Sequence, residues 1–144
     1  MNRQRRVRIT SNAIAELADA TLAALGRSDN TVTVAFVRDP AIRRLNRSYR
    51  GKDRATDVLS FSAGESEVTK DGENGRYLGD VVISTDTALA QAAESSYTID
   101  RELAELVIHG VLHLCGYDHE TDRGEMTRLE RKLRHRLLDR RTRS

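Results

Sequence analysis

The amino-acid sequence predicts an α+β protein with a single domain over residues 1–144, in which a mixed four-stranded sheet packs against about five helices. Three observations lead to this prediction. The length of 144 residues is typical of one domain with one core. Apolar side chains recur at the spacing of strands in four short segments and at the spacing of helices in five others. The segments follow one another without an internal repeat, which favours one mixed sheet layered with helices.

The first segments predict a strand, a helix and a second strand. Residues 6–10 alternate aliphatic side chains with arginines, which is a strand pattern. Ser11 or Asn12 can cap the helix that follows, whose apolar side chains recur at helical spacing until Gly26 provides a stop. Residues 31–37 are rich in β-branched side chains and predict the second strand.

The next segments predict another helix and two more strands. Asp39 is expected to cap the helix, Pro40 belongs in its first turn, and Gly51 ends it. Two short apolar segments after this helix are typical of strands, and they lie at residues 57–61 and 77–84.

A long polar loop separates these two strands at residues 62–76. Loops of this length are uncommon, and three interpretations stay open: a hairpin connection, a disordered segment and a flap over a site. After the last strand the sequence predicts three helices, over about 86–95, 99–115 and 122–139. Residues 140–144 are expected to form a flexible basic tail.

Composition excludes several classes of protein. Charged residues make up 32% and hydrophobic residues 38% of the chain, which excludes collagen-like, proline-rich and fully disordered sequences. No stretch approaches the roughly 18 apolar residues of a membrane span, and the start of the chain lacks the apolar stretch of a signal peptide. The single cysteine, Cys115, cannot form an internal disulfide. We therefore expect a soluble, cytoplasmic protein without a membrane partner.

Charge is distributed unevenly along the chain, although the formal net charge is only +2. Basic residues predominate over residues 1–56 and 106–144, and acidic residues predominate between them. Basic ends fit a polyanion that is gripped on one side, and a solvated basic tail explains the pattern equally well. Charge alone therefore does not identify a partner.

The most informative segment is residues 100–119, whose helical pattern is apolar on nearly all sides. Such a helix is expected to be central and buried. Its polar exceptions project from one narrow stripe, which contains Glu102, Glu105, His109 and His113. Buried polar groups need partners or a cleft, so we expect a site along this stripe.

Histidine spacing within this segment predicts a metal site. His109 and His113 are four residues apart, so both imidazoles can reach one ion from the same helical face. Gly116 is suited to ending the helix and turning the chain back, which would bring His119 beside the first two. The alternative, two buried core histidines and one at the surface, is less favoured because three of the chain's four histidines cluster here.

Three nitrogen ligands leave one coordination position open. A zinc ion in such a site lowers the pKa of bound water to about 7, so we expect one catalytic Zn²⁺, with nickel, copper or iron as alternatives. Cys115 projects away from the histidine stripe and is expected in the core. Asp118 and Tyr117 are candidate outer-sphere groups, or else a turn aspartate and a half-buried tyrosine. His135 is expected to face solvent.

The three histidines, with a glycine seven residues after the first, have the spacing of metzincin proteases, so the helix resembles the metal-bearing helix of zincins. Those enzymes carry a glutamate after the first histidine as general base. Here that position is Gly110, which suggests a retained metal site without the peptidase chemistry. Glycine costs a helix about 1 kcal/mol relative to alanine, which is tolerable if another element packs closely there.

The segment HGVLHLCGYDH, residues 109–119, resembles the signature of the YbeY family of bacterial endoribonucleases, also described as ribosomal RNA maturation factors. Two further blocks resemble the family, at residues 45–61 and 78–84. In order and spacing the resemblance covers about residues 30–137. The chain departs from the family at Ala55, where the family usually has proline, and at Ala63, which lies near another common proline.

The resemblance implies one zinc ion held by His109, His113 and His119, an important arginine at Arg50, and cleavage of single-stranded RNA. The implied setting is rRNA processing at the 3′ end of 16S rRNA and ribosome quality control, with rRNA and the ribosome as partners. Arg50 lies in a cationic loop that is otherwise an ordinary solvated turn. If this loop lies near the metal, Arg50 can hold a phosphate through two hydrogen bonds and offset transition-state charge.

Two alternative functions stay open at this point. The first is a noncatalytic, zinc-containing ribosome-assembly factor that binds RNA without turnover. The second, disfavoured by Gly110, is a metallopeptidase-like hydrolase. The attacking group in RNA cleavage, either water or the RNA 2′-hydroxyl, is not determined by the sequence, and neither are protein partners.

Overall fold

The computed structural model describes residues 11–64, 76–118 and 120–139. Its elements, in chain order, are α1 (Ser11–Ala24), β1 (Thr31–Val37), α2 (Asp39–Arg50), β2 (Val58–Ser62), β3 (Tyr77–Ser84), α3 (Thr85–Ser95), α4 (Ile99–Leu114), α5 (Glu125–Arg134) and a π-helical turn, η2 (His135–Asp139). In this part of the chain, none of the helices combines the length and the hydropathy needed to span a bilayer.

The three described strands form one mixed sheet in the order β1-β3-β2. β1 runs parallel to the central strand β3, and β2 runs antiparallel to it. The predicted mixed sheet is therefore confirmed with three strands instead of four, and the fourth predicted strand, residues 6–10, lies outside the described residues. The antiparallel pairing makes the loop between β2 and β3 a hairpin connection, and residues 65–75 of it lie outside the described residues.

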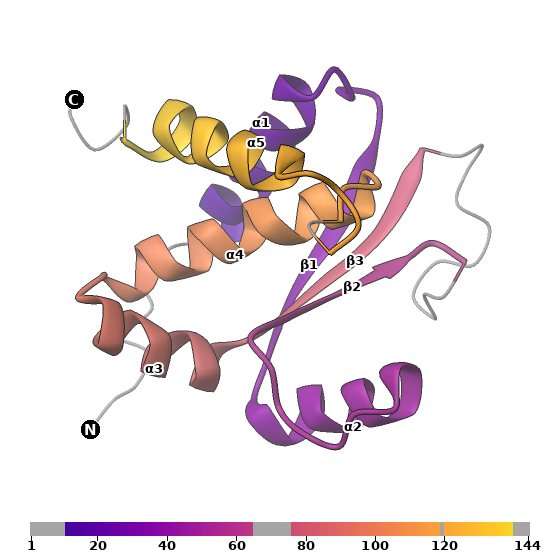
Figure 1. Ribbon diagram of the computed structural model, residues 1–144, viewed down its shortest axis with the longest axis vertical. Helices are drawn as coiled ribbons and strands as arrows, with labels where there is room; N and C mark the ends of the chain where they lie inside the picture. The colour runs from indigo at the N-terminus through magenta and orange to yellow at the C-terminus, as the bar shows by residue number, and fades with distance from the viewer. Residues whose placement is uncertain (1–10, 65–75, 119, 140–144) are drawn as a thin grey trace.

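Helices cover both faces of the sheet (Figure 1). Successive side chains of a strand point to opposite faces, so β3 contributes to two apolar clusters. Val81 and Ile83 belong to the large cluster formed with α1, α3, α4 and α5. Val82 belongs to the smaller cluster on the other face, with Ile42 of α2 and Phe61 of β2. The α2 helix therefore lies across the sheet from α4, and the segment from α2 to β2 joins the two layers.

Most predicted elements are confirmed within two residues, but the start of α2 differs. The N-cap position is occupied by Arg38 instead of Asp39. The Asp39 carboxylate accepts hydrogen bonds from Ser84 Oγ at 2.5 Å and Thr87 Oγ1 at 2.7 Å. Asp39 thus joins the start of α2 to the β3–α3 junction, a contact that local sequence does not reveal.

The last predicted helix is shorter than expected. The sequence predicted a helix over 122–139, whereas α5 begins at Glu125 and ends at Arg134, where the backbone continues as η2. Asp122 precedes the helix and accepts hydrogen bonds from Gly124 N and Met126 N, so its carboxylate closes the turn that starts α5. The predicted basic tail, residues 140–144, lies outside the described residues.

The α4 helix is central and buried, as its pattern predicted. Nine of its residues are buried, among them Leu103, Val107 and Val111. Gly110 faces β3, and a Cβ built on it would lie 2.4 Å from Val81 Cγ1. The close packing expected at this glycine is therefore confirmed, because any side chain here would overlap the Val81 side chain of the central strand.

Replacing Gly110 with alanine is expected to destabilise the protein, even though alanine favours helices by about 1 kcal/mol. The added methyl group overlaps Val81, and overpacking of a core costs about 1–3 kcal/mol. Urea unfolding will measure the loss. Gly110→Ala should cost less in a Val81→Ala background than in the unaltered protein, whereas a stabilised Gly110→Ala protein would contradict the packing argument.

Candidate metal centre

His109 and His113 face each other on α4. Their Nε2 atoms are 3.0 Å apart and their ring centroids 4.6 Å apart. Two nitrogens bound at about 2.0–2.1 Å to one tetrahedral ion would lie about 3.3 Å apart, so the observed spacing needs little adjustment to share a cation. The predicted convergence of these two imidazoles is confirmed. The role of the pair as metal ligands stays a prediction.

Glu130 of α5 holds the first imidazole from its other side. His109 Nδ1 donates to Glu130 Oε2 at 3.1 Å, and both side chains are largely buried. A carboxylate only accepts hydrogen bonds, so the ring hydrogen is on Nδ1 and the Nε2 lone pair points toward His113. Metal-binding histidines are commonly oriented by such a carboxylate.

The third predicted ligand, His119, lies outside the described residues. Among the residues that the structure does describe, no group of three His, Cys, Asp or Glu side chains is placed to hold an ion. The described part of the site therefore supplies two converging nitrogen atoms, and the third ligand stays a prediction from the sequence.

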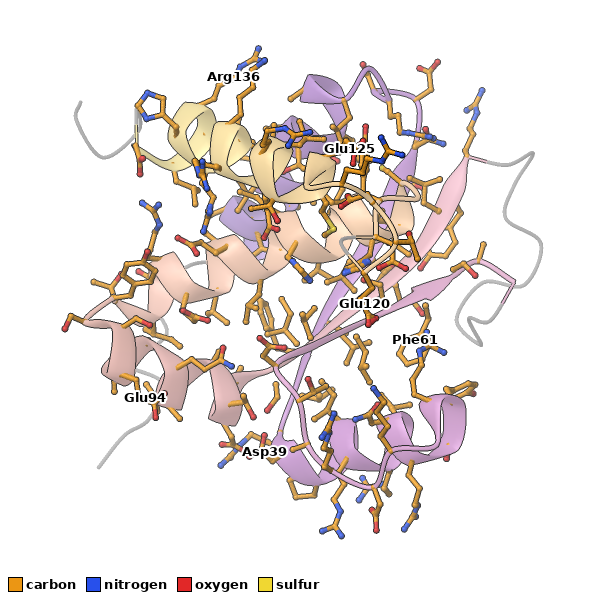
Figure 2. The ribbon with its side chains drawn as sticks, viewed as in Figure 1. Asp39, Phe61, Glu94, Glu120, Glu125 and Arg136 are labelled. Carbon is orange, nitrogen blue, oxygen red and sulfur yellow. The ribbon has the colours of Figure 1, made fainter. Side chains whose placement is uncertain are left out.

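A cavity of about 560 Å³ opens beside the imidazole pair. It is lined by α2 and the segment after it, by β2, by the end of α4, and by Glu120. Figure 2 shows Glu120 between α4 and β2, and Phe61 between β2 and α2. The lining side chains include His109 and His113 and three cations that come from a distant part of the sequence, Arg50, Lys52 and Arg54.

Arg50 is the last residue of α2 and is anchored at the edge of this cavity. Its guanidinium donates to the carbonyl oxygens of Tyr49, at 3.1 Å, and Ser60, at 2.9 Å. The guanidinium carbon lies 4.9 Å from the centroid of the Phe61 ring. These contacts hold a cation at the cavity that the imidazoles also line, as the interpretation of Arg50 required.

Ser60 connects β2 to the metal-bearing helix. Its hydroxyl donates to the Gly110 carbonyl oxygen at 3.0 Å, and its own carbonyl oxygen accepts from Arg50. Ser60 therefore links the Arg50 guanidinium to α4 through two hydrogen bonds. Sequence inspection did not single out Ser60, because one bond uses its own carbonyl oxygen, which every residue has, and the other reaches the main chain of Gly110, 50 positions away.

The two candidate outer-sphere residues do not line the cavity. The Asp118 carboxylate accepts from Glu120 N at 3.0 Å, which is the geometry of a turn aspartate. Tyr117 is half-buried and packs against the main apolar cluster. Both observations match the alternative interpretation, a turn aspartate and a half-buried tyrosine. An outer-sphere role for either residue stays a prediction.

Cys115 is half-buried at the edge of the core instead of inside it, whereas His135 faces solvent as expected. Cys115 packs against the main apolar cluster away from the cavity, and burial raises the pKa of its thiol, which favours the unreactive protonated form. His135 is exposed, with Nδ1 3.5 Å from Asp139 Oδ2.

Sequence reasoning missed Glu130. It is 21 positions from His109 in the chain, which hides their contact. A signal was present, however: Met126, Glu130 and Leu133 share one face of α5, and both apolar members are buried. An acidic residue on a buried helix face requires a partner, and the polar stripe of α4 provides it.

Glu102, one of the polar residues on that stripe, forms a separate buried cluster. The Gln91 amide nitrogen, in the orientation that satisfies both of its atoms, donates to Glu102 Oε2 at 2.8 Å and Asp57 Oδ2 at 3.2 Å. Burial raises the pKa of Glu102, and the negative charges of Glu105 and Asp57 raise it further.

Replacing Glu102 with glutamine is expected to stabilise the protein near neutral pH. Because its pKa is raised on folding, the folded protein binds this proton more tightly than the unfolded chain does, and stability falls as pH rises above the usual carboxyl range. The glutamine removes that dependence. Urea unfolding from pH 4 to 8 should show a gain that grows with pH, and an equal gain at every pH would contradict this account.

The comparisons with known proteins agree on one family. The family model for endoribonuclease YbeY matches residues 1–138. The chain is 43% identical over 135 residues to the endoribonuclease YbeY of Geobacter sulfurreducens, which covers 92% of this chain and 88% of the relative. The Aquifex aeolicus protein of the same name is 42% identical over 133 residues, covering 91% and 83%.

A solved structure extends the likeness to the fold. The solution structure of the Thermotoga maritima protein TM1509 is 30% identical to this chain, with a TM-score of 0.56, and the match covers 88% of this chain and 82% of the other. Sequence likeness over nearly the whole length, with a shared fold, decides the assignment. The chain belongs to the endoribonuclease YbeY family.

Proposed function

We propose that this protein is a zinc-dependent endoribonuclease that cleaves single-stranded RNA in rRNA processing, at the 3′ end of 16S rRNA, and in ribosome quality control. The observation that carries the proposal is that Arg50 and the facing pair His109 and His113 line one open cavity. Under this proposal the protein acts in the cytoplasm on the RNA of the ribosome, and α4 serves as a zincin-like metal-bearing helix.

The donor set fits zinc. Two imidazoles present their Nε2 atoms to one point, Glu130 orients the first of them, and His119 completes a three-nitrogen set in the sequence. When bound, zinc supplies Lewis acidity toward a phosphoryl oxygen and lowers the pKa of water. The open cavity beside the imidazoles leaves room for substrate.

Arg50 is proposed as the catalytic cation. Its guanidinium is held by two main-chain carbonyl oxygens and by the ring of Phe61, so little side-chain entropy is lost when a phosphate binds. Contact with a nonbridging phosphate oxygen would offset the negative charge that develops during phosphodiester cleavage. Lys52 and Arg54, which line the same cavity, would hold adjacent phosphates of the strand.

Metal analysis combined with a chelate-and-restore assay tests the proposed function. The purified protein is expected to contain about one zinc ion and to cleave single-stranded RNA, with little action on duplex RNA or on peptides. Chelation should abolish cleavage, and added zinc should restore it. Protein that binds RNA but has no turnover above that of an identically purified inactive variant would contradict the proposal and favour the assembly-factor alternative.

Gly110 argues against the peptidase alternative in three dimensions as well as in sequence. This position faces Val81 of β3, so a glutamate side chain there would run into the sheet. The chain thus lacks both the residue and the space for a general base directly after the first histidine. Peptide cleavage that depends on zinc, without RNA cleavage, would overturn this conclusion.

Replacing Glu130 with alanine is expected to weaken zinc binding by about 10–100-fold, because the His109 ring loses the carboxylate that sets its orientation. Glutamine at this position keeps an acceptor oxygen and should lose less. Competition with a chromophoric chelator measures the affinity without reference to activity. Glu125→Gln, at an exposed position on the same helix, is the matched control, and equal affinities for all four proteins would contradict the assigned role.

A further inference from the structure

A second cavity, of about 530 Å³, lies where the start of α4 meets α5 and η2. None of its lining residues also lines the cavity beside the imidazoles. Most of the lining side chains are basic, and the set is Tyr97, Arg101, Arg128, Arg131, Lys132, Arg134, His135 and Asp139. The cavity therefore presents positive charge that the proposed catalytic site does not use.

Two of the arginines are neutralised by carboxylates. Arg101 contacts Glu105 at 2.8 Å and Asp139 at 2.7 Å, and Arg134 contacts Glu105 at 3.2 Å. The pKa of Asp139 is lowered chiefly by its hydrogen bond from Arg101. These ion pairs link α4 to α5 and η2, and they add almost no net charge to the cavity.

Three further cations of the cavity differ from these two arginines. Arg128, Arg131 and Lys132 are exposed, and their spacing of three and four residues places them on one face of α5. Among the described carboxylates, none lies within ion-pair distance of these three side chains. Uncompensated cations on one helix face attract a polyanion. Figure 2 shows Arg136 farther along the same segment, also directed outward.

An exposed aromatic ring borders this basic face. Tyr97 is 42% exposed, and the Arg101 guanidinium carbon lies 5.6 Å from its ring centroid. Proteins that bind single-stranded nucleic acids combine solvent-facing aromatic rings with nearby cations. The bases stack on the rings and the phosphates contact the cations.

The second cavity lies beside the same polar side of α4 that carries the imidazoles. Arg101, Glu105 and His109 follow one another at four-residue spacing on α4, and each contacts a residue of α5 or η2. Eight residues of helix separate Arg101 from His109, which is about 12 Å along the axis. A strand lying at the imidazoles can therefore reach the second cavity within a few nucleotides.

We propose that the cavity between α4 and α5 binds phosphates of the single-stranded RNA that flanks the cleavage point, with Arg128, Arg131 and Lys132 as the contacting cations and Tyr97 as a stacking platform. This inference rests on the proposed function, because it extends the path of the same RNA substrate. It predicts that long RNAs bind more tightly than short ones through residues that take no part in cleavage.

The test compares Arg131→Glu/Lys132→Glu with Arg27→Glu/Arg76→Glu, a control that changes the same charge at two exposed arginines elsewhere. Binding of an RNA of about 30 nucleotides is measured by fluorescence anisotropy against salt, in a His113→Ala background that prevents cleavage. Each lost contact removes about 0.7 from the slope of log affinity against log salt. The first pair should therefore lower the slope by about 1.4 and weaken binding by about 20-fold near 0.1 M salt.

Two further measurements separate the contributions. Tyr97→Ala should weaken binding of the long RNA while leaving the salt slope unchanged, since stacking releases no counterions. With His113 intact, Arg131→Glu/Lys132→Glu should reduce kcat/KM for the long RNA and leave it unchanged for an RNA of about six nucleotides.

The outcomes distinguish this inference from the proposed function. An unchanged salt slope in Arg131→Glu/Lys132→Glu, or the same loss in the Arg27→Glu/Arg76→Glu control, would overturn the inference. If the protein with all of its histidines cleaves no RNA but the α5 pair still lowers affinity and slope, the RNA-binding cavity stands and the proposed nuclease activity fails. Equal losses of kcat/KM for short and long RNA would also overturn the inference.

Discussion

Replacing His113 with alanine is expected to remove zinc from the protein and to reduce RNA cleavage to background. His113 Nε2 lies 3.0 Å from His109 Nε2, so its loss leaves one described nitrogen at the point where the ion is expected. Metal-ion catalysis supplies several kcal/mol of transition-state stabilisation, and each 1.36 kcal/mol is a factor of ten in rate. We therefore expect a decrease of at least about 10³-fold, measured with single-stranded RNA and checked by metal analysis.

His135→Ala is the matched control for this experiment, because the chain's other described histidine is exposed and does not line the cavity beside the imidazoles. It should retain zinc, and it should retain turnover on an RNA of about six nucleotides, which is too short to occupy the imidazole cavity and also the second cavity that His135 lines. The fold of His113→Ala is checked by thermal unfolding, since the imidazole is only partly buried and its removal leaves no large core cavity. Full zinc content and unchanged cleavage in His113→Ala would refute the proposed metal centre.

Replacing Arg50 with alanine is expected to reduce turnover by about 10²–10³-fold while zinc content stays the same. This is the loss measured when one preorganised donor to a developing oxyanion is removed. Arg50 contacts main-chain carbonyl oxygens and the Phe61 ring, and none of these is a proposed metal ligand. Its cation–π contact at an exposed position contributes at most about 1 kcal/mol to stability. Steady-state kinetics and metal analysis of the same preparation measure both quantities.

Arg47→Ala provides the comparison, since Arg47 is an exposed arginine one turn earlier on α2 and does not line the imidazole cavity. Its turnover should stay close to that of the unaltered protein. Arg50→Lys keeps the charge without the planar pair of donors and should recover only part of the activity. Loss of zinc or of the fold in Arg50→Ala would show that Arg50 has a structural role instead.

Much of the fold could be predicted because short segments carry strong local signals. Residues 31–37 and 77–84 were predicted as strands and match β1 and β3, since β-branched runs favour extended backbone. Gly51 was predicted to end α2, and it adopts the left-handed conformation that this role requires, with φ of 71°. The capping residue of α2 and both ends of α5 differ from the prediction, because contacts made elsewhere in the fold decide helix ends.

Parts of the candidate site could likewise be predicted from local sequence, and other parts could not. His109 and His113 could be placed on one face from their spacing, because a helix has a known rotation per residue. Arg50 could be related to them only through family resemblance, since about 60 residues of chain intervene and no local rule brings α2 beside α4. Glu130 went unnoticed because α5 crosses α4 at an angle that periodicity does not specify.

By itself, the amino-acid sequence determined the elements, the apolar character of the central helix and the pairing of two imidazoles on it, because each depends on neighbours within a few residues. The tertiary structure decided which distant groups meet that pair. It joined Arg50 to the imidazole cavity through Ser60, placed Glu130 behind His109, and packed Gly110 against Val81. These contacts depend on how helices and strands pack, and packing is a property of the whole core.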